Sequence, residues 1–158
     1  MDPNLTSSVA VSGMLIGTDG TVYRLQSGRR RHLSASDVFV WDRFLDRNRD
    51  WVEWCAYDVR LSGPDGAQDP TLTPEERGWL TLRQKRCDVI VSTVEMVFVV
   101  EIKERLNFAA IGQAFGYTSM LRRLAPPSVK LRGVVCCLES DEDLEPVCQE
   151  CGVQIWLA

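Results

Sequence analysis

The sequence predicts an α/β fold, with a central mixed β-sheet flanked by helices and an N-terminal β-hairpin. One observation is an unbroken apolar run at 97–100, which is typical of a strand buried on both faces. Another is the order of segments after residue 33: a helix, three strands, a helix, a strand, a helix and a strand. This order favours one sheet with helices on its faces.

The N-terminal hairpin is predicted at residues 9–25. Apolar and alternating stretches there flank Thr18-Asp19-Gly20, which has the composition of a tight turn. A polar, basic loop follows at 26–32. We expect the first 32 residues to form an accessory element in front of the core.

The core is expected to begin with a helix that Ser34 or Ser36 caps and that ends near Asn48. Its apolar stripe consists of Val38, Trp41, Phe44 and Leu45. A strand is predicted within 51–61 and a loop at 62–73, and Thr73-Pro74-Glu75-Glu76 is a helix-start signal.

The second half of the chain has a more regular pattern. Strands are predicted at 86–91, 97–103, 131–138 and 153–157, and helices at 108–124 and 141–150. Asn107 is expected to cap the first of these helices, and Gly152 to end the second. No repeat or long linker divides the 158 residues, so we expect a single domain over 1–158, with its core at about 33–158.

Composition excludes several classes of protein. No apolar run reaches the ~18 residues of a transmembrane helix. The N-terminus has no basic segment followed by an apolar core, as a signal peptide would. The expectation is a cytoplasmic, intracellular protein without membrane association.

The net charge of −4 argues against a protein that coats nucleic acid, but local basic clusters remain. The clusters that could bind DNA contain Arg29, Arg30, Arg31, Arg86, Arg122 and Arg123. Solvated surface is an equally good interpretation of each cluster taken alone. Loss of salt-dependent DNA binding after substitution would separate the two interpretations.

The six cysteines are expected to be free thiols, because disulfides are rare inside cells. Cys148 and Cys151 have the spacing of half a zinc site or of a redox pair. No second pair completes such a site, and His32 is the single histidine. Packing in the core is therefore the favoured role of the cysteines.

Three residues suggest chemistry. Glu101 and Lys103 are two apart at the end of the buried strand, so they point the same way. Taken alone they are well explained as an ion pair at the strand end. Asp88 lies early in the preceding strand, and a hairpin would bring it beside Glu101. Two adjacent carboxylates repel unless a cation lies between them, and oxygen ligands suit Mg²⁺ or Mn²⁺.

With these residues, the sequence resembles the PD-(D/E)XK nuclease superfamily. The family's motif is an Asp on one strand and an acidic residue, any residue and Lys on the next; here these are Asp88 and Glu101-Ile102-Lys103. Cys87 stands where the family has proline. Gln113 and Tyr117 on the following helix are similar to the Gln-x-x-x-Tyr motif of the RecB-like branch, and the resemblance covers about residues 51–157.

The resemblance implies a restriction-endonuclease-like fold and a metal-dependent nuclease that hydrolyses DNA. It implies a catalytic role for Asp88, Glu101, Lys103, Gln113 and Tyr117. The implied metal ligands are Asp88, Glu101 and the carbonyl of Ile102. Gln113 would hold Lys103, Glu101 or a metal-bound water.

Other implied features are less specific. Gly112 and Gly116 would let the helix approach the sheet closely. A further acidic residue could be Asp42, Asp46 or Glu53. No iron–sulfur cluster is expected, because the cysteine spacing does not match.

The alternative to a nuclease is a catalytically inactive DNA-binding or assembly module with the same fold. The sequence does not distinguish endonuclease from exonuclease or DNA from RNA, and it does not reveal which nucleic-acid structure is bound. A homodimer or a partner protein would supply specificity, since no second recognition domain is present.

Overall fold

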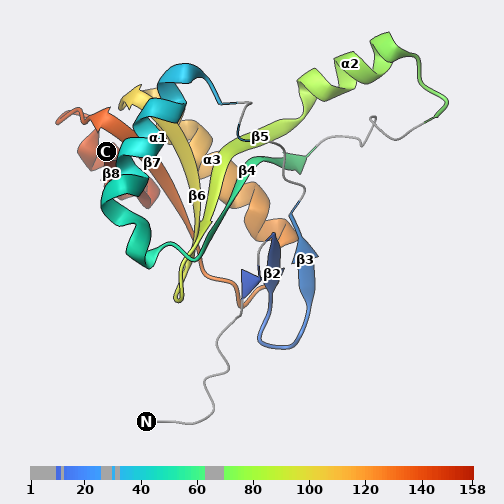
Figure 1. Ribbon diagram of the computed structural model, residues 1–158, viewed down its shortest axis with the longest axis horizontal. Helices are drawn as coiled ribbons and strands as arrows, with labels where there is room; N and C mark the ends of the chain where they lie inside the picture. Colours follow the sequence, from blue (N-terminus) through green and yellow to red (C-terminus); the bar gives the residue numbers. More distant parts are fainter. Residues whose placement is uncertain (1–9, 12, 26–29, 31–32, 63–69) are drawn as a thin grey trace.

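A computed structural model describes residues 10–11, 13–25, 30, 33–62 and 70–158 (Figure 1). The body of the molecule is a five-stranded sheet in the order β4-β5-β6-β7-β8. Its strands are β4 (Trp54–Ser62), β5 (Lys85–Ser92), β6 (Val97–Arg105), β7 (Leu131–Glu139) and β8 (Val153–Leu157). The first three strands pair antiparallel and the last three parallel, so the predicted mixed sheet is confirmed.

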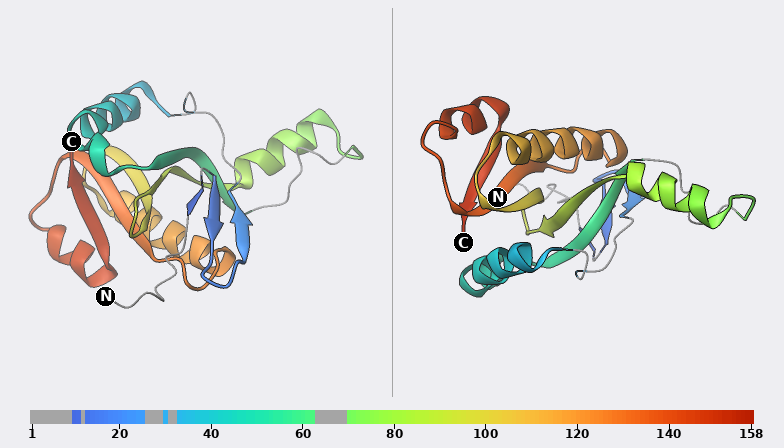
Figure 2. Two further views of the ribbon diagram at one scale, coloured as in Figure 1. Left: turned by 60° about the horizontal axis from the view of Figure 1, so that its bottom comes forward. Right: turned by 90° about the horizontal axis from the view of Figure 1, so that it is seen from above.

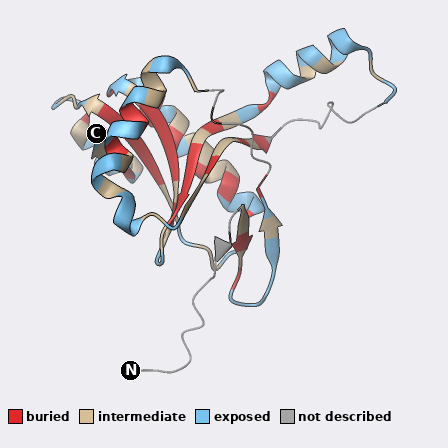
Figure 3. Ribbon diagram, viewed as in Figure 1, coloured by how far each residue is buried: buried red, intermediate tan, exposed pale blue. Residues whose placement is uncertain are grey.

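Helices cover both faces of this sheet (Figure 2). Helix α1 (Ala35–Asn48) lies on one face, where Val40, Trp41 and Phe44 pack against apolar side chains of β5, β6 and β7. Helices α3 (Phe108–Leu124) and α4 (Glu145–Cys151) lie on the other face. The strands are the most deeply buried part of the chain (Figure 3), and their apolar burial is the main source of the sheet's stability.

Helix α1 begins where the sequence predicts. Ser34 is its cap: the Ser34 hydroxyl accepts a hydrogen bond from the Asp37 backbone N–H at 3.1 Å. The Asp37 carboxylate in turn accepts from the Ser34 backbone N–H at 3.3 Å and from its hydroxyl at 2.6 Å. This reciprocal capping box satisfies backbone donors that the first turn leaves free. The short 3₁₀ helix η2 (Arg49–Trp51) then leads into β4.

Helix α3 is capped as predicted but approaches the sheet through a different glycine. The Asn107 side-chain oxygen accepts a hydrogen bond from the Ala110 N–H at 2.9 Å. A Cβ atom added to Gly133 in β7 would lie 2.8 Å from Thr118 Oγ1 and 2.9 Å from the Ala114 carbonyl oxygen. Cβ atoms added to Gly112 and Gly116 would meet nothing within 4 Å. The expectation that these two helical glycines permit the close approach is therefore wrong.

Helix α4 begins later than the sequence predicts. Residues 141–144 form a turn instead, with the Leu144 N–H bonded to the Asp141 carbonyl at 2.9 Å. The Asp141 side chain also accepts from the Asp143 N–H at 3.1 Å, and such local bonds compete with helix formation. Gly152, in the left-handed conformation with φ 67°, ends the helix as predicted.

The N-terminal element is a small antiparallel sheet of β1 (Ala10–Val11), β2 (Met14–Ile16) and β3 (Val22–Arg24). The predicted hairpin is confirmed as β2 and β3, and β1 adds a third strand. Leu15 and Leu25 join the apolar cluster between the main sheet and α3. This small sheet is therefore docked on the core through apolar contacts.

Helix α2 (Pro74–Arg83) projects from the body and buries none of its residues (Figures 1 and 3). Thr73 caps it with a capping box, as the sequence predicts. Trp79 and Leu82 are 58% and 85% exposed. The predicted loop before this helix falls largely on residues 63–69, which lie outside the described residues. None of the helices in the described part of the chain has the length and apolar character that crossing a bilayer requires.

Candidate active site

The two central strands part at the predicted catalytic residues. The pairing of β5 with β6 ends at Val89 opposite Val100. Beyond that point β5 continues to pair with β4, and β6 with β7. Asp88 and Glu101 are the next residues on the two strands, so they face each other across the gap. Such a gap leaves side chains and backbone groups accessible that a continuous ladder would cover.

Asp88 closes the ladder with its side chain. Its Oδ2 atom accepts a hydrogen bond from the backbone N–H of Ile102 at 2.9 Å. The carboxylate thus replaces the backbone carbonyl that a paired strand would offer. This bond fixes Asp88 against β6.

Lys103 and Glu101 share the α3 face of β6, as the two-residue period of a strand requires. The Lys103 ammonium donates to Glu101 Oε1 at 2.9 Å and to the Ile102 carbonyl oxygen at 2.8 Å. It also lies 3.8 Å from Asp88 Oδ2. A single positive charge therefore sits among three oxygen atoms from both sides of the gap.

Glu101 is the most deeply buried member of the group, with 4% of its side chain exposed. Its Oε2 atom is buried and makes no hydrogen bond. Burial raises the pKa of Glu101 to about 7, and the nearby charge of Asp88 adds to the rise. The Lys103 ammonium opposes both effects without cancelling them.

The pKa values of Asp88 and Lys103, the two neighbours of Glu101, are shifted as well. Burial raises the pKa of Asp88, while the hydrogen bond from Ile102 lowers it in part. Burial is the largest single influence on the pKa of Lys103 and lowers it, but the charge and hydrogen bond of Glu101 and the charges of Asp88 and Asp37 together raise the net pKa. The group therefore contains a firmly protonated lysine and two carboxyls that hold protons more strongly than exposed ones do.

These residues fit a divalent cation. The buried Glu101 Oε2 atom has no hydrogen-bond partner, so it is a free oxygen donor. The Lys103 ammonium lies among oxygen atoms of Glu101, Ile102 and Asp88, which shows that these oxygens surround a position suited to a positive charge. Within the described residues, no three His, Cys, Asp or Glu side chains gather at one site, so the candidate donors here are two carboxylates and a backbone carbonyl. Two carboxylates and one carbonyl leave other coordination positions to water, which suits Mg²⁺.

Gln113 and Tyr117 lie on the flank of α3 that faces the gap. The Gln113 side-chain amide donates to the Tyr117 hydroxyl at 3.4 Å. Burial raises the pKa of Tyr117, and the charges of Glu101 and Asp88 add to the rise although the Gln113 bond opposes it. Tyr117 is therefore within electrostatic reach of the carboxylates. Gln113 is bonded to Tyr117 rather than to the predicted Glu101 or Lys103.

The three candidates for a further acidic residue lie elsewhere. Asp42 is paired with Arg30. Asp46 lines a surface hollow on α1, and Glu53 accepts from the Ser92 hydroxyl at 3.3 Å, at the other end of β5 from Asp88. Among the described residues, no hydrogen bond or ion pair joins any of the three to Asp88, Glu101 or Lys103, so the assignment of a further acidic residue stays a prediction.

Asp37, in the first turn of α1, lies within electrostatic reach of the site. Its charge contributes, as a minor cause after burial, to the raised pKa values of both Asp88 and Glu101. The signal that could have found it is its place in the first turn of α1, three residues after the Ser34 cap. The sequence pattern gave no reason to bring that turn to the ends of β5 and β6.

Two of the predicted DNA-binding arginines have partners within the protein. Arg30 pairs with Asp42, and its guanidinium carbon lies 5.7 Å from the centre of the Tyr57 ring. Arg86 donates to Asp58 Oδ2 at 2.6 Å and to the Gln84 side-chain oxygen at 2.9 Å. Their guanidinium groups are thus engaged on the protein. The predictions for Arg29 and Arg31 fall outside the described residues.

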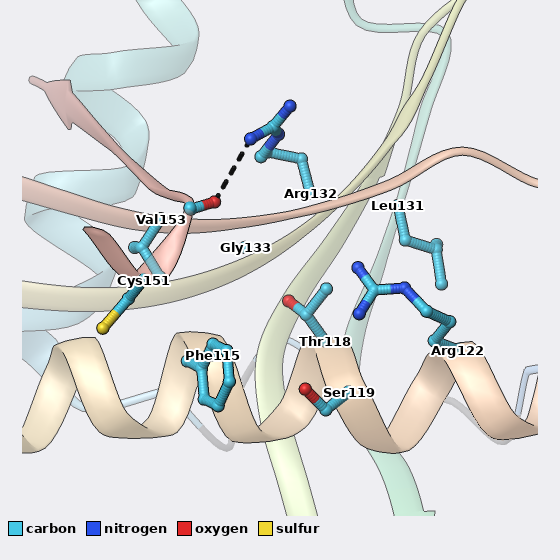
Figure 4. Close-up of a pocket in the computed structure, with 10 residues that line it drawn as sticks. Phe115, Thr118, Ser119, Arg122, Leu131, Arg132, Gly133, Cys151 and Val153 are labelled. Carbon is cyan, nitrogen blue, oxygen red and sulfur yellow. Dashed lines mark hydrogen bonds between the residues drawn. The ribbon is translucent and has the colours of Figure 1, made fainter. Parts of the chain in front are cut away.

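Arg122 lines a hollow of about 250 Å³ between α3, the start of β7 and the junction of α4 with β8 (Figure 4). Its guanidinium points between Thr118 and Leu131. Arg132 lines the same hollow, and its guanidinium donates to the Gly152 carbonyl oxygen at 3.4 Å. Arg122 therefore belongs to this hollow, and Arg123, the next residue of α3, is exposed.

All six cysteines are described and carry free thiols. Cys136 and Cys137 are buried in β7, in agreement with the predicted packing role. Cys148 is the buried residue of α4, while Cys151 is half-buried at the end of the same helix. The absence of zinc and iron stays a prediction.

The sequence matches no protein-family model, and no curated protein matches it at a significant level. Among solved structures, the chain resembles a repair endonuclease from Pyrococcus abyssi with a TM-score of 0.50 and 14% identity, over 80% of this chain and 48% of that one. An EndoMS–dsDNA complex aligns with a TM-score of 0.48 and 14% identity, over 87% of this chain and 50% of that one. The chain thus spans about half the length of these structures.

The likeness to the repair endonuclease shows the fold. The predicted restriction-endonuclease-like α/β core, with its central mixed sheet and flanking helices, is confirmed.

Proposed function

We propose that this chain is a PD-(D/E)XK nuclease that hydrolyses DNA phosphodiester bonds with Mg²⁺ or Mn²⁺. The observation that carries the proposal is the meeting of Asp88, Glu101 and Lys103 where β5 and β6 part. Burying two carboxyl groups and a lysine together costs free energy of folding. Clusters of this kind are found most often at sites that bind a ligand or carry out a reaction. The fold shared with a repair endonuclease supports the same conclusion.

The residues have distinct roles in this proposal. Asp88, Glu101 and the Ile102 carbonyl would hold the metal. Such an ion, when bound, polarises a phosphate oxygen and lowers the pKa of water. Lys103 would move from the Ile102 carbonyl toward the phosphate, where its positive charge stabilises the charge that develops during hydrolysis. Tyr117, held by Gln113, would position Lys103 or a phosphate oxygen at the side of the gap nearest α3.

The surroundings of the gap suggest how DNA would approach. Helix α2 leads directly into β5, so it projects from the end of the sheet that carries Asp88. The Arg83 guanidinium lies 4.6 Å from the centre of the exposed Trp79 ring. A cation beside an exposed aromatic ring is a combination that binds nucleic acid through both phosphate and base. We infer that α2 contacts DNA beside the cleaved bond.

A cleavage assay with matched variants tests the proposal. Asp88→Asn and Glu101→Gln should each reduce Mg²⁺-dependent cleavage by a factor of about 10³ or more, because each removes a metal ligand. Asp46→Asn is the control, since Asp46 is an exposed acid on α1 away from the gap. Duplex, single-stranded, flapped and four-way DNA should all be offered as substrates. Equal cleavage by all four proteins would rule the site out.

The same assay covers the alternative of an inactive DNA-binding module. Such a module would bind one of the four DNA forms and cleave none of them, with Mg²⁺ or with Mn²⁺. Both outcomes are visible on one gel when binding and cleavage are measured at the same protein concentrations.

A further inference from the structure

An apolar groove lies at the end of the sheet remote from the catalytic gap. It has a volume of about 480 Å³ and lies between the segment that follows α1 and the turn that joins β5 to β6. Its lining consists of Asp50, Trp51, Val52, Glu53, Thr93, Val94, Glu95 and Phe98. Phe98 is on the α1 face of β6, whereas Glu101 is on the α3 face. Along the strand the two are roughly 10 Å apart.

The floor of this groove is a rigid aromatic surface. Trp51 and Phe98 meet edge to face with ring centres 6.2 Å apart. Both rings also pack on Trp156, at 5.2 and 4.9 Å. The Trp51 indole N–H donates to the Asn48 side-chain oxygen at 3.2 Å, which fixes the ring further. The surface is nevertheless open, since Trp51 is 38% exposed and Val94 is 75% exposed.

The rim of the groove is acidic. Asp50, Glu53 and Glu95 line it, and the lining contains no lysine or arginine. Within the described part of the chain, the ion pairs involve other residues. Three negative charges without a cation would repel nucleic-acid phosphates. The groove therefore suits a ligand of opposite charge to the proposed DNA substrate.

We propose that this groove docks an arginine-bearing apolar segment of a partner protein. A guanidinium over the face or edge of Trp51 would gain a cation–π contact. The three carboxylates would accept its hydrogen bonds at the rim, and apolar neighbours of the arginine would cover Val94 and Phe98. Because the groove and the catalytic gap occupy opposite ends and faces of β6, a partner docked here would leave the gap free. The proposal does not depend on nuclease activity.

The test is calorimetric titration of the full chain with the peptide acetyl-Leu-Arg-Phe-Arg-Leu-amide. We expect binding that weakens at least tenfold when both arginines are replaced by citrulline, which keeps the shape and removes the charge. The protein variant Asp50→Asn/Glu53→Gln/Glu95→Gln should weaken binding by a similar factor. The control Asp46→Asn/Glu142→Gln/Glu150→Gln makes the same change in net charge at exposed acids outside the groove and should bind like the wild type.

Three outcomes would overturn the proposal. Equal affinity for the arginine and citrulline peptides would mean that charge plays no part. Equal loss in the groove variant and in the control would assign the effect to net charge. A dimer of the chain alone in sedimentation, which the groove variant dissociates, would make a second copy the occupant. Circular dichroism of each variant checks that the fold is retained.

Trp51→Leu is a second groove variant, which removes the aromatic ring and leaves the charges of the rim unchanged.

Discussion

At the scale of single residues, Lys103 stands where a metal ion would compete with it. Its ammonium bonds to Glu101 and to the Ile102 carbonyl, two of the three groups proposed as metal ligands. A cation of either kind relieves the repulsion between Asp88 and Glu101. Lysine and metal are therefore alternative counterions for the same oxygens, and binding of one must shift the other.

The first prediction follows from this competition. Lys103→Met removes the competing charge and leaves Asp88, Glu101 and the Ile102 carbonyl in place. Mn²⁺ should then bind at least as tightly as to the wild type in calorimetric titration. Cleavage by the same variant should fall by a factor of about 10² to 10³, as when one stabilising group is removed from a transition state. Loss of Mn²⁺ binding together with cleavage would show that Lys103 is structural.

The second prediction concerns pH and the metal-free protein. The folded pKa of Glu101 is about 7, above its ordinary value of 4.5. Between these values the folded chain keeps a proton that the unfolded chain releases, so this residue's contribution to stability falls as pH rises. Glu101→Gln removes the titration. In thermal unfolding with chelator, the stability of the variant relative to the wild type should increase from pH 5 to pH 8, by on the order of 1–3 kcal/mol.

The control for this prediction is Glu142→Gln, which makes the same substitution at an exposed acid in the turn before α4. A constant difference for Glu101→Gln would mean that Glu101 is ionised throughout in the folded protein.

The residues of the gap could be predicted because their signal is local. Glu101 and Lys103 follow from the two-residue period of a strand, and Asp88 follows from one hairpin. Asp37 could not be predicted in the same way. Its proximity to the site depends on where α1 lies across the sheet, and that placement is decided by packing of Trp41 and Phe44 rather than by spacing in the sequence.

At the scale of elements, α3 is positioned by a glycine that belongs to the sheet. The helix needs Gly133 because its Ala114 carbonyl and Thr118 hydroxyl approach β7 closely. From the sequence alone, Gly112 and Gly116 of the helix are expected to make the close contact with the sheet, since small residues often mark helix contacts. A Cβ atom at either of these glycines would meet nothing within 4 Å. The position of glycines in the sequence therefore does not reveal whether the helix or the strand provides the room for a close contact.

The third prediction compares these glycines. Gly133→Ala should destabilise the fold by about 1–3 kcal/mol, because the added methyl group overlaps backbone and hydroxyl atoms. Gly116→Ala adds a methyl group in open space within a helix and should stabilise by about 0.5–1 kcal/mol. Chemical denaturation measures both. Equal effects of the two substitutions would contradict the assignment of Gly133 as the contact point.

The fourth prediction concerns α2 as a DNA-binding arm. Trp79→Ala and Arg83→Ala should each weaken DNA binding several-fold, because they remove a stacking surface and a phosphate partner. The turnover rate at saturating DNA should change little, since neither residue reaches the gap. Arg47→Ala, which removes the same charge from the end of α1, is the control. Fluorescence anisotropy with labelled DNA measures the affinities, and unchanged affinity in both α2 variants would refute this role.

At the scale of the whole molecule, the architecture was predictable because hydrophobic pattern and turn residues agree along most of the chain. The buried strands, the caps at Ser34, Thr73 and Asn107, and the stop at Gly152 all stand where the sequence places them. The start of α4 was misplaced because Asp141 offers its own backbone bonds in a turn. The projecting course of α2 and the acidic groove could not be predicted, since both depend on what the chain leaves uncovered.

The central claim is that Asp88 and Glu101 serve one metal-dependent hydrolysis of DNA. The measurement that tests it most directly is the initial cleavage rate of the purified full chain on the same DNA, with Mg²⁺ and with excess chelator. We expect cleavage with Mg²⁺, no detectable product with chelator, and restoration of cleavage when Mg²⁺ is added back. Cleavage that continues at the same rate in excess chelator would contradict it.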